Sequence, residues 1–168
     1  MKSNQVTDIL KQAIIMETRG KALYAKVAEQ TQSDDVRKIF EIMANEEQIH
    51  IELLSQQFVH YQKTGQFIKP SLDMATGNDA IANLILTEKV KKDISGAGFE
   101  AAAISAAIDM ESKSIEVYAA RANEATDTIE KELYDWLANW EKGHHKMLID
   151  LNRELTEKVW YDNNFWPF

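Results

Sequence analysis

Residues of the kind that bind metal ions occur twice in this chain, in the same order and at the same spacing. The two copies, 94 positions apart, are Glu17, Tyr24, Glu47 and His50, followed by Glu111, Tyr118, Glu141 and His144. In each copy 30 residues separate the first glutamate from the glutamate of a Glu-x-x-His motif. A helical hairpin of that length carries both groups to the same height, so the pattern is typical of a two-metal carboxylate site inside a four-helix bundle.

The apolar residues around these groups recur at steps of three to four, which predicts four amphipathic helices. Glu17 lies on the apolar stripe that also contains Leu10 and Tyr24. In the second segment Glu47 and His50 are one turn apart on one face. The third and fourth segments repeat this arrangement, so we expect every helix to carry ionisable groups into the core at mid-length.

Four buried carboxylates would repel one another, and each uncompensated ion costs on the order of several kcal/mol. Two divalent ions would neutralise them, and two imidazoles would complete the ligation without adding charge. The predicted metal ligands are therefore Glu17, Glu47, His50, Glu111, Glu141 and His144. A different interpretation places these groups at helix edges with their charged ends in water. It would have to explain six coincidences on four stripes, and we favour the metal site.

The elements that position these groups follow from capping residues and breaks in the periodicity. We predict helices over about 5–30, from the cap at Ser33 to about 64, from Phe99 to about 125, and from a cap at 126–128 to about 158. The predicted fold is all-α, with two antiparallel hairpins joined by a long crossover over about 65–98. A single bundle domain would cover 1–158, and an aromatic extension, 159–168, would dock on its own helices or at a dimer interface.

Composition excludes several classes of function. The formal charge of −8 disfavours nucleic acid and anionic membranes as partners. The start of the chain lacks the pattern of a signal peptide, so we expect a cytoplasmic protein, and one that forms a homodimer. The sequence contains no cysteine, which removes disulfides and iron-sulfur ligation from this chain.

Four segments, METRGKALY, NEEQIH, MESKSIEVY and WEKGHH, resemble the rubrerythrin-like branch of the ferritin-like superfamily. The resemblance implies a ferritin-like bundle that binds two iron ions per chain. Glu17, Glu47 and His50 would hold one iron, and Glu111, Glu141 and His144 would hold the other. It also implies that Glu47 and Glu141 bridge the two ions, while Glu17 and Glu111 are terminal ligands.

The chain departs from the rubrerythrin pattern in two respects. It has no four-cysteine rubredoxin domain, so its electrons would come from an external donor such as a separate rubredoxin. Ser114 stands where that family has an extra glutamate connected with peroxide turnover. The six ligands are also similar to those of bacterioferritin, but Gln48 and Ile49 occupy the place of its haem-binding methionine, so we expect no haem.

Three functions are compatible with these features. The first is a non-haem di-iron redox protein of oxidative-stress defence that reacts with hydrogen peroxide or O2. The second is a ferroxidase or iron-storage protein of bacterioferritin type without haem, and the third is a metal-free helical interaction protein. The ligand types accept manganese as well as iron. Tyr24 and Tyr118 would hydrogen-bond a ligand carboxylate on a neighbouring helix or relay an electron, unless they are simply core tyrosines.

Overall fold

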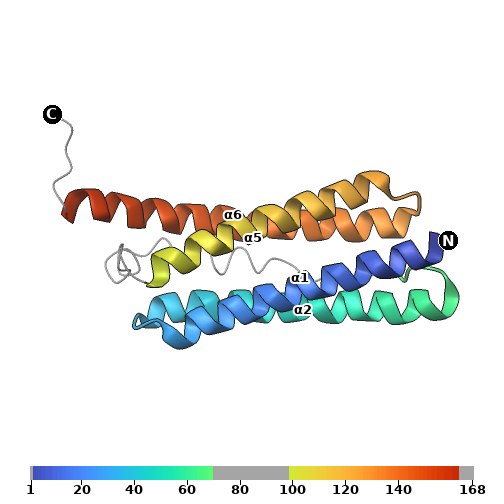
Figure 1. The fold of residues 1–168 in the computed structure, drawn as a ribbon, viewed down its shortest axis with the longest axis horizontal. Helices are drawn as coiled ribbons and strands as arrows, with labels where there is room; N and C mark the ends of the chain where they lie inside the picture. Colours follow the sequence, from blue (N-terminus) through green and yellow to red (C-terminus); the bar gives the residue numbers. More distant parts are fainter. Residues whose placement is uncertain (1, 70–98, 163–168) are drawn as a thin grey trace.

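The computed structural model describes residues 2–69 and 99–162, which form four α-helices (Figure 1). The helices are α1 (Lys2–Gln30), α2 (Asp34–Thr64), α5 (Phe99–Glu124) and α6 (Thr128–Asp162). The helices α1 and α2 pack as one antiparallel hairpin, and α5 and α6 pack as the other. The predicted all-α four-helix bundle is confirmed.

The two hairpins are placed so that α2 and α5 run in the same direction (Figure 1). The end of α2 and the start of α5 consequently lie at opposite ends of the bundle, as the predicted crossover requires. The first residues of the crossover pack on α2, where the Gln57 side chain donates to the Ile68 carbonyl at 2.7 Å and accepts from its N–H at 3.0 Å. Apolar residues at helical spacing within the crossover also predict a short helix over 79–93, which lies outside the described residues.

The turns between the helices follow from side chains that satisfy free backbone groups. Ser33 caps α2 by accepting from the Val36 N–H at 3.3 Å. Asp127 accepts from the N–H groups of Ile129 and Glu130 at 2.8 and 2.9 Å, which caps α6. Gly65 ends α2 with φ 71°, a left-handed conformation that glycine adopts without steric cost.

The observed helices extend slightly beyond the predicted boundaries. The helix α1 begins at Lys2, earlier than predicted, and α6 continues to Asp162. The predicted aromatic extension, 159–168, therefore starts inside α6. The docking of its side chains lies outside what the structure describes.

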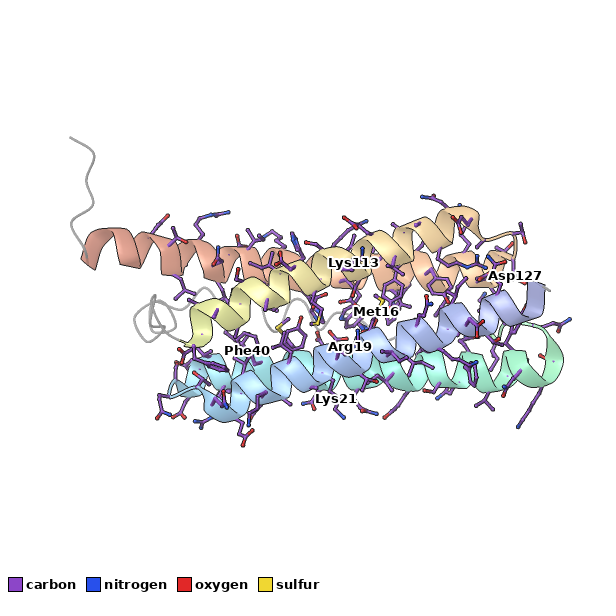
Figure 2. The ribbon with its side chains drawn as sticks, in the orientation of Figure 1. Met16, Arg19, Lys21, Phe40, Lys113 and Asp127 are labelled. Carbon is purple, nitrogen blue, oxygen red and sulfur yellow. The ribbon has the colours of Figure 1, made fainter. Side chains whose placement is uncertain are left out.

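Two apolar clusters fill the bundle, one toward each end. The first includes Phe40, Met43 and Leu148, and the second includes Leu10 and Leu133, all of them fully buried. Figure 2 shows Phe40 near the end where α1 and α2 are joined, with Asp127 at the opposite end. Within the described residues, no helix has both the length and the apolar character that a membrane crossing needs. The predicted ligands occupy the layer between the two clusters.

Candidate metal centre

The structure brings all six predicted ligands together at mid-length of the bundle. Each helix supplies at least one of them, namely Glu17 from α1, Glu47 and His50 from α2, Glu111 from α5, and Glu141 and His144 from α6. None of the six is more than 3% exposed. Carboxylates are rarely buried this deeply without a partner, so the negative charge of this layer has to be balanced by protons or bound cations.

The ligand atoms form two overlapping groups. One consists of Glu17, Glu47, His50 and Glu141, and the other of Glu47, Glu111, Glu141 and His144. Within each group the nearest ligand atoms all lie within 4.8 Å of one another. Glu47 and Glu141 belong to both groups, which is the arrangement expected of carboxylates that bridge two ions.

Each histidine turns its Nδ1 atom toward three carboxylates. Nδ1 of His50 lies 3.3 Å from Glu17, 3.4 Å from Glu47 and 3.1 Å from Glu141.

Nδ1 of His144 lies 3.4 Å from Glu47, 3.4 Å from Glu111 and 3.2 Å from Glu141. The two rings are therefore placed alike with respect to the carboxylates, one in each group.

Each of the two predicted tyrosines hydrogen-bonds a glutamate of the opposite hairpin that belongs to one ligand group only. The Tyr24 hydroxyl donates to Glu111, and the Tyr118 hydroxyl donates to Glu17. Burial raises the pKa of both phenols well above the ordinary value, and the charge of the glutamate that each one contacts raises it further. Both phenols therefore stay protonated and act as donors.

The carboxylates divide into two kinds in the metal-free protein. Burial raises the pKa of Glu17 and of Glu111 well above the ordinary value, and the charge of Glu141 raises both further. Burial would also raise the pKa of Glu141, but the charge on His50 and contacts with the two imidazoles hold it far below the ordinary value. Burial and the charge of Glu141 would raise the pKa of Glu47, but contacts with Glu17, His144 and His50 lower it below the ordinary value.

The histidines respond to the carboxylates in the same way. Burial by itself would lower the pKa of His50, but the charge on Glu141 and contacts with Glu17 and Glu47 raise it well above the ordinary value. The pKa of His144 is likewise raised, against the effect of burial, by its carboxylate neighbours. In the metal-free protein these shifts favour proton binding at the two histidines, Glu17 and Glu111, and they favour the anionic forms of Glu47 and Glu141.

The residues present fit a pair of divalent ions. Several ligand atoms that face the centre are buried and have no hydrogen-bond partner among the described residues, namely Glu47 Oε2, both carboxylate oxygens of Glu141, and His144 Nδ1. Such atoms are rare in proteins and cost free energy unless something else binds them. Four carboxylates and two imidazoles also match the charge and ligand preferences of two Fe²⁺ or Mn²⁺ ions.

One residue that touches the site, Glu46, was not predicted from the sequence. Glu46 is 6% exposed and accepts from Nε2 of His144 at 2.5 Å. The indole N–H of Trp140 also points to it, at 3.4 Å. The sequence shows Glu46 directly before the ligand Glu47. Glu46 was not predicted to be buried because it lies beside the apolar stripe of the helix and not on it.

Several other polar residues lie outside the ligand layer or at its edge. His60 and His145 are partly buried and belong to neither ligand group. Ser114 is 8% exposed, one turn after Glu111 on α5. At Gly20, on α1, a Cβ would lie 3.4 Å from the carboxyl carbon of Glu47, which is an ordinary van der Waals contact.

Comparison with known proteins adds one finding to this geometry. A family model described as Rubrerythrin matches residues 8–152, which includes all six ligands. No curated protein and no solved structure matched the chain.

Proposed function

The chain belongs to the rubrerythrin family, and we propose that it is a di-iron redox protein that reacts with hydrogen peroxide or O2. The observation that carries the proposal is the pair of overlapping ligand groups that share Glu47 and Glu141. Bound iron would supply the electrons that reduce the oxidant, because the carboxylate and imidazole side chains of the site cannot donate electrons. Residues of the chain would hold the ions and orient their ligands.

The first task of these residues is to hold the ions. Glu17 and His50 would bind one ion, and Glu111 and His144 would bind the other, with Glu47 and Glu141 between them. Flexible carboxylates tolerate both oxidation states of iron, because they can change their mode of ligation at little cost.

The second task is to hold the terminal carboxylates in place. Tyr118 binds Oε1 of Glu17, while Oε2 of the same carboxylate stays 3.3 Å from Nδ1 of His50. One oxygen is thus fixed from the opposite hairpin and the other faces the ligand group. Hydrogen bonds of this kind orient ligands and are a major determinant of metal affinity.

The third task, delivery of electrons, falls to a partner. The chain has no cysteine, so it cannot carry a rubredoxin-type iron centre or an iron-sulfur cluster of its own. We therefore propose an external one-electron donor such as a rubredoxin, and hydrogen peroxide or O2 as the substrate.

The test is stopped-flow mixing of anaerobically Fe(II)-loaded protein with peroxide and with O2 in separate runs, followed by absorbance of the oxidised site. We expect oxidation by peroxide to be the faster of the two, and repeated turnover when a reductant is present. Glu141→Ala should abolish the rapid phase, whereas the exposed Glu52→Gln, which has the same loss of charge as Glu141→Ala, should retain it. Rapid phases of equal rate in wild type and Glu141→Ala would overturn the proposal.

An iron-oxidising or iron-retaining protein is the second candidate, and Ser114 favours it. A serine at this buried position cannot supply the additional carboxylate that the family resemblance connects with peroxide turnover. The same experiment separates the two functions. A faster reaction with O2, together with uptake of iron beyond two ions per chain, would support iron oxidation and retention.

A further inference from the structure

We infer that Glu46 is a positioning residue that makes the two metal positions unequal, so that the position at His144 binds its ion first. The inference rests on the proposed metal site and adds an order of loading to it. It follows from a difference between the two halves of the bundle at one pair of equivalent positions.

The contact between Glu46 and His144 is short and buried. Glu46 Oε2 lies 2.5 Å from Nε2 of His144, a fully buried ring, and Glu46 is itself only 6% exposed. The indole N–H of Trp140 donates to the same oxygen at 3.4 Å. The acceptor is therefore held from two sides, and it faces the nitrogen of His144 that points away from the ligand group.

Within residues 2–69 and 99–162, the equivalent nitrogen of the other histidine has no such partner. Nε2 of His50 is buried and makes no hydrogen bond to any of these residues. The ring of His50 instead lies edge-on to two indoles, with centroids 5.6 Å from Trp136 and 5.5 Å from Trp140.

This difference is encoded in the repeat itself. The offset of 94 residues that relates the ligands of the two halves also relates Glu46 to Trp140. Where the first copy of the pattern has a carboxylate beside its Glu-x-x-His motif, the second copy has an indole. Because each residue faces the histidine of the other half, the carboxylate serves His144 and the indole serves His50.

A carboxylate behind a histidine ligand has three consequences for metal binding. It keeps the proton on Nε2, so that the lone pair of Nδ1 faces the metal. It fixes the plane of the ring and makes the imidazole a stronger donor. In this protein Nδ1 of His144 then points at Glu47, Glu111 and Glu141, all within 3.4 Å. In the described part of the chain, no carboxylate accepts a hydrogen bond from Nε2 of His50.

A purely structural role for Glu46 predicts something different. If Glu46 only pairs with a protonated His144 to stabilise the bundle, its replacement would lower stability and leave the two metal positions equally affected. A positioning role predicts an effect on one binding step and not on the other. Separate binding constants for the two steps therefore distinguish the two roles.

The experiment is an anaerobic titration of the metal-free full chain with Co²⁺, followed by the visible absorption of the bound ion. We expect two resolved steps in the wild type. In Glu46→Gln, which preserves shape and an acceptor oxygen but not the charge, the tighter constant should weaken by about tenfold or more. The weaker constant should stay within about twofold of the wild-type value. Glu52→Gln, an equal change of charge on an exposed face of α2, should alter neither.

The wild type alone already tests the inference if the variant does not fold. Two ions bound with equal constants in the wild type would overturn the unequal positions while leaving the proposed di-metal site intact. Equal weakening of both steps in Glu46→Gln, or no weakening, would overturn the role of Glu46. Failure of the wild type to bind Co²⁺ at all would remove the proposed site and this inference together.

Discussion

Loading of the site with two divalent ions should release about four protons per chain. In the metal-free protein burial and the charge of Glu141 raise the pKa of Glu17 and of Glu111, and the neighbouring carboxylates raise the pKa of His50 and of His144, so we expect all four groups to carry a proton near neutral pH. Metal ligation requires every one of these groups to lose its proton. Two protons come from the glutamates and one from each histidine, while the low pKa of Glu141 means that it contributes none.

The charge balance supports this number. Without metal, the anionic Glu47 and Glu141 are balanced by the two imidazolium rings. With two divalent ions bound, four carboxylates are balanced by the metal charges. The six ligands together with any bound ions carry no net charge in either state, which is what the low local dielectric favours.

The assay is addition of Co²⁺ to metal-free protein in a weakly buffered solution near neutral pH, with a pH-indicator dye calibrated against acid. Glu17→Gln removes one of the four releasable protons, because the amide has none to lose, so release at saturation should fall to about three. Glu52→Gln, which lies on the exposed surface, should still release about four. Binding of two ions with almost no release in the wild type would refute the proposed protonation of the site.

Three further predictions concern stability. The free energy of unfolding of the metal-free protein should fall as the pH rises from about 5 to about 8, because Glu17 and His50 hold their protons more tightly in the folded protein than in the unfolded chain. Their contribution is complete below their unfolded pKa values and is lost as the pH rises toward the raised folded values. A rise in stability across this range in urea denaturation would contradict the prediction. Ser33→Ala removes the cap of α2 and should cost about 1 kcal/mol in urea denaturation without changing the number of bound ions, so an unchanged midpoint would count against the cap. Gly20→Ala should stabilise the metal-free protein by up to about 1 kcal/mol through helix propensity, because its Cβ would make ordinary van der Waals contacts with the side chains of Glu47 and Met110, at 3.4 and 3.5 Å. A loss of stability in urea denaturation would contradict this prediction.

Much of the fold could be predicted because local signals and the long-range repeat agreed. Ser33 and Gly65 mark the ends of α2 in the sequence, and the structure has them as its caps. The parallel run of α2 and α5 followed from the need to bring two equivalent hairpins to one site, given a connection long enough to cross the bundle. The extension of α6 to Asp162 was not predicted, although residues 159–162 contain no glycine or proline that would end a helix.

The site was predictable only as far as its members lie on apolar stripes. Periodicity placed Glu47 and His50 in the core, and a hydrogen bond from Tyr118 to a ligand carboxylate was one of the two roles predicted for it. The sequence could not identify Glu17, on the other hairpin, as the acceptor. Glu46 was missed for a related reason, since an acidic residue beside the stripe is usually solvated. Its burial depends on the approach of α6, which places His144 and Trp140 against it.

Binding of two metal ions between Glu47 and Glu141 is the property on which the proposed function depends. Native mass spectrometry of the full chain, after anaerobic incubation with Fe(II) and removal of unbound metal, tests it most directly. We expect a mass increase of two iron ions per chain in the wild type and in Glu52→Gln, and loss of the doubly loaded species in Glu141→Ala. A wild-type chain that carries no iron, or a Glu141→Ala chain that still carries two ions, would contradict the proposed site.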